Sequence, residues 1–378
     1  MQSKQGTADQ VPRLHVLDAF RALAISAVLV CHYLATWAPP GYRYNLYGFQ
    51  HTYPTWLGWG ALGVQFFFII SGFVIFMTLQ RCDNLIEFWF RRFARLYPAY
   101  ITAMVVTFFI ANELGPREFS TTRTDFLFGL AFLTPFVPGV RFIDQAYWSL
   151  VVELQFYFFV GVIYAAARGR FVRAWTVFVG AGLVCWIAGS KGELHGLRAL
   201  AERALLVPYL PQFTLGIAFY YLYNGRTAGW RLLVVLAALN YVIVARAAPA
   251  AWHLAHAIMV LLFVLFVWGR LAWLAVRPLT ILGEISYSLY LIHAYVGITL
   301  IGLVTRRTGA PDLIAVLFAT LVCVGLAFAL TKGVEIPAKR ALLDWGRAHA
   351  SVARRFPSLA FTTVLPVEAN TLKSREFS

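Results

Sequence analysis

The sequence predicts an all-α, polytopic membrane protein with about ten transmembrane helices, one short re-entrant or interfacial segment, and both termini in the cytoplasm. Three observations support this fold class. Of the 378 residues, 60% are hydrophobic and only 13% are charged, with a mean hydropathy of +0.68. Apolar stretches recur along the chain instead of forming one anchor. Basic residues are concentrated between alternate stretches. A water-soluble fold is therefore excluded.

A helix needs about 20 apolar residues to cross the hydrocarbon core. The ten stretches that we expect to cross are residues 14–37, 59–80, 96–111, 147–167, 174–190, 204–223, 232–245, 252–269, 279–304 and 313–332. We expect a polar cytoplasmic tail over residues 1–13, a transmembrane domain over 14–337 and a basic cytoplasmic tail over 338–378. Pro337 is expected to end the last helix.

The basic residues orient these helices, because Lys and Arg are retained on the cytoplasmic side. Residues 126–137 are apolar but short, and ten crossings without them place 21 of the 32 Lys and Arg inside and ten outside. If they crossed as well, the cluster at Arg168, Arg170 and Arg173 would change sides. The segment is therefore predicted not to cross. Topology explains most of the net charge of +15, and we expect the lipid bilayer as a partner but no nucleic acid.

No metal site is expected. The four cysteines contain no CxxC pair, so neither a disulfide framework nor a zinc site is predicted. His253 and His256 lie one helical turn apart but lack a third ligand nearby in the sequence.

Ionisable side chains inside a span are costly and mark a functional site by default. The first span contains Asp18, Arg21 and His32. Arg21 and His32 are 11 residues apart, close to three turns, so both project from one helix face, and Asp18 can pair with Arg21 at i,i+3. The alternatives are a snorkelling Arg21 and an interhelical hydrogen bond for His32.

The fourth span begins with Trp148 and Ser149 and carries Glu153 about 9 Å below its outer start. His32 lies at a similar depth below the outer end of the first span. A neutral imidazole beside a carboxylate has the chemistry of a general base. The alternative is that Glu153 neutralises a helix end.

Arg91, Arg92 and Arg95 stand at a cytoplasmic helix boundary after the second span. Such a cluster can bind phosphate groups through charge-assisted hydrogen bonds. Positive-inside retention or contact with anionic lipid would give the same cluster.

The ninth span has two polar stripes. Ser286, Tyr290 and His293 share one face, and Glu284 shares another with Tyr287. Interhelical hydrogen bonds are the favoured role of these Ser and Tyr residues. At the end of the last span, Glu335 is placed to meet the cytoplasmic arginines.

The order of these motifs resembles the acyltransferase-3 family over residues 14–337. The matching segments are 17–24 with His32, 63–73 with Ser71, 91–98, 148–150 with Glu153, and 282–293. Ala19 stands where the family usually has Gly, and Leu154 stands where it often has a second glutamate.

The resemblance implies a multi-pass O-acyltransferase of the bacterial inner membrane, without the fused SGNH-hydrolase domain of longer members. Members O-acylate sugars of lipopolysaccharide, exopolysaccharide, Nod factors and macrolide antibiotics. The implied donor is acyl-CoA, with acetyl-CoA favoured. The implied acceptor is a hydroxyl of a carbohydrate or glycolipid. No cofactor is expected to be bound permanently.

Carried over by position, the resemblance implies that Arg21 and His32 form an essential pair assisted by Glu153. His32 would act as a general base or as a transient acyl carrier. Arg92 and Arg95 would contribute to handling the acyl donor. We expect the phosphates of the donor near Arg91, Arg92 and Arg95. The supporting residues would be Asp18, Ser71, Trp148, Ser149, Glu284, Tyr287, His293 and Glu335. The main alternative is a secondary transporter that uses Asp18, Arg21, His32 and Glu153 as a proton or substrate relay, although no internal repeat is present.

Overall fold

The computed structural model describes residues 14–35, 54–167, 169–190, 194–225 and 229–348, and over these it is helical with no strand. The long helices are α1 (His15–Leu34), α2 (Gly63–Leu79), α3 (Leu85–Glu113), α5 (Trp148–Ala167), α6 (Phe171–Ala188), α8 (Leu210–Tyr223), α9 (Trp230–Val244), α10 (Ala250–Val267), α11 (Arg277–Ile292), α12 (Tyr295–Thr308) and α13 (Asp312–Leu330). The shorter helices are α4 (Arg123–Leu130), α7 (His195–Ala199) and α14 (Ile336–Ala348). The expected tail over residues 1–13, and residues 349–378 of the other, lie outside the described residues.

Each of the ten predicted spans overlaps one of the long helices, or the α11 and α12 pair. In the described part of the chain, seven helices are long and apolar enough to cross a membrane, and α11 with α12 gives an eighth if the pair counts as one span. The protein is therefore a polytopic, all-helical membrane protein. Ten crossings and cytoplasmic termini stay predictions.

Residues 126–137 do not form a helix long enough to cross. They contribute to α4, which has eight residues, and to a 3₁₀ turn over Thr134–Phe136. Eight helical residues span about 12 Å, against about 30 Å of hydrocarbon. Phe132 between them has a positive φ of 56°, so the chain turns sharply there. A re-entrant or interfacial position for this segment is consistent with its length.

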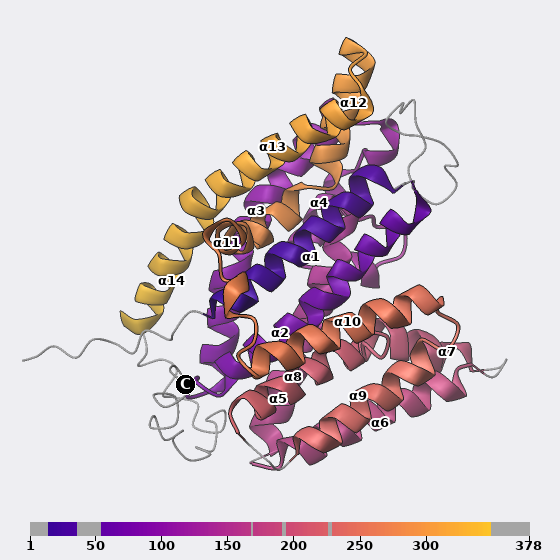
Figure 1. Cartoon of the computed structure of the whole chain (residues 1–378), viewed down its shortest axis with the longest axis vertical. Helices are drawn as coiled ribbons and strands as arrows, with labels where there is room; N and C mark the ends of the chain where they lie inside the picture. The colour runs from indigo at the N-terminus through magenta and orange to yellow at the C-terminus, as the bar shows by residue number, and fades with distance from the viewer. Residues whose placement is uncertain (1–13, 36–53, 168, 191–193, 226–228, 349–378) are drawn as a thin grey trace, which may run out of the picture.

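The long helices lie in two groups (Figure 1). One group contains α1, α3, α11, α12 and α13, and the other contains α5, α6, α8, α9 and α10, with α2 packed against both α1 and α8.

Glycines allow the closest crossings. A Cβ at Gly283 of α11 would collide with the carbonyl oxygen of Asp18 in α1, and one at Gly72 of α2 would collide with that of Phe213 in α8.

The ninth predicted span, residues 279–304, is broken. Helices α11 and α12 meet at an angle of 75° across His293 and Ala294. The buried carboxylate of Asp144, from the segment before α5, accepts a hydrogen bond of 2.8 Å from the backbone N–H of Tyr295, at the start of α12. A distant residue thus satisfies a helix terminus that a continuous span would not expose.

The expectation that Pro337 ends the last helix is wrong. Helix α13 continues through a π-helical turn, Thr331–Glu335, into α14, and Pro337 is the second residue of α14. Proline removes one backbone donor, and the wider π turn accommodates the change in hydrogen bonding. Residues 338–348, expected to begin the tail, are therefore helical and pack against α3.

Candidate active site

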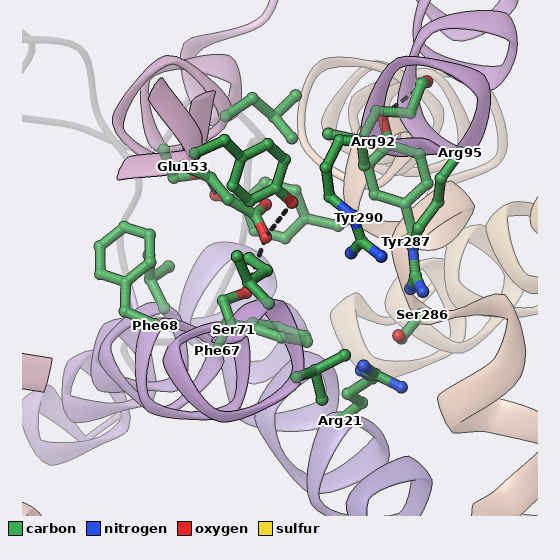
Figure 2. Close-up of a pocket in the computed structure, with 17 residues that line it drawn as sticks. Arg21, Phe67, Phe68, Ser71, Arg92, Arg95, Glu153, Ser286, Tyr287 and Tyr290 are labelled. Atoms are coloured by element: carbon green, nitrogen blue, oxygen red, sulfur yellow. Dashed lines mark hydrogen bonds between the residues drawn. The ribbon is translucent and has the colours of Figure 1, made fainter. Parts of the chain in front are cut away.

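A polar cavity lies where α1, α2, α3, α5 and α11 meet, and we call it the central cavity (Figure 2). Its volume outside the protein atoms is about 710 Å³. Apolar side chains such as Phe67 and Phe68 form part of its wall. The polar side chains that line it are Arg21, Ser71, Arg92, Arg95, Ser149, Glu153, Tyr157, Ser286, Tyr287 and Tyr290. Five helices that are distant in sequence therefore bring together seven of the 14 predicted site residues, half of the set.

Glu153 is held by two hydroxyl groups. Its Oε1 accepts hydrogen bonds of 2.7 Å from Ser71 Oγ of α2 and of 2.7 Å from Tyr157 Oη, one turn later on α5 (Figure 2). Among the described residues, no donor bonds the other carboxylate oxygen, Oε2. Tyr157 was not predicted, although its i+4 spacing from Glu153 places it on the same face. The carboxylate is thus oriented in the cavity with one oxygen available to a ligand.

The three arginines lie within α3, not at its start. The helix begins at Leu85 because the Asn84 side chain caps it, accepting a hydrogen bond of 2.9 Å from the Glu87 N–H. Arg92 and Arg95, three residues apart, share a face and point into the central cavity (Figure 2). Arg91 points elsewhere and pairs with Glu87 at 2.6 Å. The structure therefore brings two of the three predicted arginines to the site.

The two cavity arginines differ in their partners. Arg92 donates a hydrogen bond of 2.9 Å to Thr78 Oγ1, and its guanidinium carbon lies 6.0 Å from the centroid of the Tyr157 ring. Within the described ranges, Arg95 makes no hydrogen bond or ion pair. A guanidinium group that faces a cavity and donates to no protein acceptor is suited to bind an anionic ligand.

A second cavity, which we call the inner cavity, adjoins the central cavity and shares Arg21, Val74 and Arg95 with it. Its volume outside the protein atoms, with the open solvent included, is about 990 Å³. The start of α1 and the start of α14 line it, and α14 contributes Lys339. Sequence reasoning missed Lys339 because it assigned the residue to a tail beyond Pro337.

Three of the charged residues that line the inner cavity, Asp18, Arg21 and Glu284, are in ion pairs. The predicted pair between Asp18 and Arg21 is confirmed, with 3.1 Å between Oδ1 and Nη1. Glu284 pairs with Lys332 at 2.8 Å. Glu335 accepts hydrogen bonds from Ser288 (3.0 Å) and Thr331 (3.4 Å), so within the described part of the chain it does not meet the cytoplasmic arginines as expected.

His32 lies beyond the central cavity and meets His293. Its Nδ1 is 2.8 Å from Nε2 of His293, and the two rings are nearly parallel, with centroids 4.8 Å apart. Among the described residues, His32 and Glu153 are not hydrogen-bonded to each other. The interhelical hydrogen bond weighed for His32 is therefore present, and its partner is the histidine at the break between α11 and α12.

Tyr290 connects this histidine pair to the central cavity. Its hydroxyl lies 2.7 Å from Ser149 Oγ and donates to the Ala146 carbonyl at 3.0 Å, so the ring forms part of the cavity wall. Its backbone carbonyl lies 2.7 Å from Nδ1 of His293. Trp148, beside Ser149, packs its ring against Phe68, which lines the cavity. The pair thus begins directly behind the Tyr290 wall.

The family model of the acyltransferase-3 family, described as an acyltransferase domain, matches residues 14–332. This range includes every helix that lines the central cavity. The chain therefore belongs to the acyltransferase-3 family.

Similarity to individual proteins covers shorter stretches. An uncharacterized protein of Haemophilus influenzae is 31% identical over 135 residues, which are 31% of this chain and 54% of that protein. An O-acetyl transferase of Shigella phage Sf6 is 27% identical over 194 residues, 48% of this chain and 55% of the phage protein. The peptidoglycan O-acetyltransferase OatA of Listeria monocytogenes is 27% identical over 158 residues, 37% of this chain and 22% of OatA. The matched part thus spans about half of the first two relatives and about a fifth of the third. No solved structure matches the chain.

Proposed function

We propose that this protein is a membrane-embedded O-acyltransferase that moves an acyl group, acetyl in the favoured case, from acyl-CoA to a hydroxyl of a carbohydrate-containing acceptor. Family membership and the names of two relatives, both O-acetyltransferases, support acyl transfer over a secondary transporter. The observation that carries the proposal is Arg95, a guanidinium without a protein partner in the described residues, where the inner and central cavities meet.

The donor enters through the inner cavity in this proposal. With ten crossings, the inner cavity opens on the cytoplasmic side of a bacterial inner membrane, where acyl-CoA is made. Arg92, Arg95 and Lys339 bind the phosphate groups of CoA, because guanidinium and ammonium groups pair with phosphate oxygens. The pantetheine arm passes Arg21, which lines both cavities, and runs through the central cavity to bring the thioester towards His32.

The acceptor hydroxyl is activated from the outer side. Glu153 Oε2, with no donor in the described residues, accepts a hydrogen bond from the acceptor, since Oε1 already accepts two. His32 serves as the general base, or accepts the acyl group first and passes it on. Both routes need a neutral imidazole with an available lone pair. The acceptor is a glycolipid, a surface polysaccharide or a glycosylated metabolite.

Transfer by the purified full chain in lipid nanodiscs tests this function. We expect label from radiolabelled acetyl-CoA to appear on a glycolipid or polysaccharide acceptor. We expect His32→Ala to abolish transfer and Glu153→Gln to lower kcat, whereas His253→Ala, which changes an exposed histidine outside both cavities, should transfer at the wild-type rate. Full transfer by the His32→Ala variant would remove the base and carrier roles. If the wild-type chain transfers no label to any acceptor class, the proposed function is wrong.

A further inference from the structure

The hydrogen bonds of His293 determine where the protons of the histidine pair lie. His293 is fully buried, and its Nδ1 lies 2.7 Å from the Tyr290 carbonyl oxygen. A carbonyl oxygen only accepts, so Nδ1 of His293 carries the proton. A charged imidazolium at a fully buried position would be costly, so the ring is neutral and its Nε2 is an acceptor.

The protonation of His32 follows from that of His293. Because Nε2 of His293 accepts, the hydrogen bond of 2.8 Å between the rings is donated by Nδ1 of His32. A neutral imidazole has one N–H group. Because that proton is on Nδ1 of His32, its Nε2 carries the lone pair. His32 is half-buried whereas His293 is fully buried, so the base nitrogen belongs to the more accessible member of the pair.

We propose that His293 is a positioning residue that holds His32 in the tautomer with its lone pair on Nε2, through the ordered contacts from the Tyr290 carbonyl to His293 and from His293 to His32. The inference rests on the proposed function and identifies the group that prepares its base. A carboxylate commonly fills this place behind a catalytic histidine, and here a second, neutral histidine fills it.

The break between α11 and α12 holds His293 in place. The residue is at the end of α11, and its backbone carbonyl accepts a hydrogen bond of 2.8 Å from the hydroxyl of Tyr33, the neighbour of His32 on α1. Asp144 fixes the following turn through the Tyr295 N–H. Tyr33 thus ties α1 to the break, and Asp144 ties the segment before α5 to it, so the distance between the two imidazoles does not depend on side-chain packing alone.

The proposed step conserves protons. The acceptor O–H proton moves to Nε2 of His32 while the acceptor oxygen bonds to the acyl carbon. The thioester C–S bond then breaks, and the CoA sulfur takes the proton from His32. During the step His32 carries a positive charge, and His293 Nε2 stabilises that charge by accepting the Nδ1 proton in a stronger hydrogen bond.

Two substitutions at one position separate positioning from packing. His293→Leu removes the acceptor, whereas His293→Gln retains an amide oxygen that can accept from His32 Nδ1. We expect kcat to fall about 10- to 100-fold in His293→Leu, as for other groups that orient an imidazole, with KM for acetyl-CoA unchanged. His293→Gln should recover most of that loss. In a His32→Ala background, His293→Leu should cause no further loss. His256→Leu is the matched control, since His256 also bonds a carbonyl one turn earlier on its helix. Equal losses in the Leu and Gln variants would overturn the proposal.

A spectroscopic measurement tests the tautomer without any substrate. Solid-state NMR of the full chain in bilayers with ¹⁵N-labelled histidine reports the protonated nitrogen of each ring, and comparison with His32→Gln identifies His32. We expect the Nδ1–H form at His32 in the wild type and in His293→Gln, and a shift towards the Nε2–H form in His293→Leu. A wild-type Nε2–H form, or an unchanged spectrum of His32 in His293→Leu, would contradict the proposal. Absence of transfer by a wild-type protein with the expected spectrum would instead contradict the proposed function.

Discussion

Arg91 and Arg95 are one helical turn apart on α3, yet their side chains have different surroundings. Arg91 pairs with Glu87, whereas Arg95 lines both cavities and has no partner in the part of the chain that the structure describes. An arginine already paired with a carboxylate has fewer donors to offer a ligand phosphate. The two residues therefore have different expected roles, although the sequence presents them as one cluster.

The proposed donor site is tested by substituting Arg95 and Lys339, two cations with no ion pair among the described residues. In Arg95→Ala/Lys339→Ala we expect the Kd for acetyl-CoA to rise about 10- to 100-fold per lost phosphate contact, because hydrogen bonds to charged groups contribute about 1.5–3 kcal/mol each. The wild-type affinity should also fall with added salt. Isothermal titration of the full chain in nanodiscs measures the Kd.

Two single variants serve as comparisons for the donor site. Arg91→Ala removes the same charge one turn from Arg95, and Arg347→Ala removes an exposed charge from the helix that carries Lys339. Both should bind acetyl-CoA as the wild type does. If Arg91→Ala weakens binding as much as the Arg95→Ala/Lys339→Ala double variant, the arginines act through general charge and not through a built site.

At the scale of elements, the break between α11 and α12 distinguishes this structure from a bundle of continuous spans. It places His293 beside His32 and opens a helix N-terminus inside the protein. Asp144 satisfies that terminus and also accepts a hydrogen bond of 2.9 Å from the Ala146 N–H just before α5. One buried carboxylate thus fixes the relative positions of α5 and α12.

Asp144→Ala should therefore destabilise the fold. The change leaves two buried N–H groups, of Ala146 and Tyr295, without an acceptor, and each unsatisfied group costs about 1–3 kcal/mol. We expect a lower Tm by intrinsic fluorescence in detergent. We also expect kcat to fall, because the position of His293 depends on the geometry of the break. Asp344→Ala, which removes an exposed carboxylate of α14, is the control and should melt as the wild type does. A Tm equal to that of the wild type in Asp144→Ala would show that the break does not depend on this cap.

At the scale of the whole molecule, the distribution of positive charge predicts the orientation on which the donor path depends. The inner cavity contains the start of α1 and the start of α14, so it lies at the end of the bundle predicted to face the cytoplasm. An inverted protein would present that cavity to the side that lacks acyl-CoA. Orientation and function are therefore linked.

Cysteine accessibility tests the orientation. In a chain whose four cysteines are replaced, Arg141→Cys and Arg170→Cys place single thiols at exposed positions on either side of α5. A membrane-impermeant maleimide applied to intact cells with a permeable outer membrane should label position 141 and not position 170. Labelling of position 170 and not of position 141 before lysis would mean that residues 126–137 cross, and labelling of both thiols would contradict the predicted orientation of α5.

Part of the site follows from sequence alone, and part does not. The spacing of Asp18 and Arg21 predicts their pair, because residues three apart on a helix are neighbours whatever surrounds them. The hydropathy pattern likewise predicts the long helices, although it predicts α11 and α12 as one span. The assignment of Glu153 and Arg92 to the site remains a prediction, which their positions around one cavity support.

The class of protein and the helical segments follow from the sequence alone, because the length of an apolar stretch and the helical spacing of its residues are local properties of the chain. The family follows from the order of the motifs. Only the tertiary structure decided that His32 meets His293, that Arg91 turns away from the cavity, and that Lys339 joins it. These contacts link residues on different helices or depend on how a helix is rotated about its axis. Rotation and crossing angle are set by packing across the whole bundle, which no local pattern in the sequence specifies.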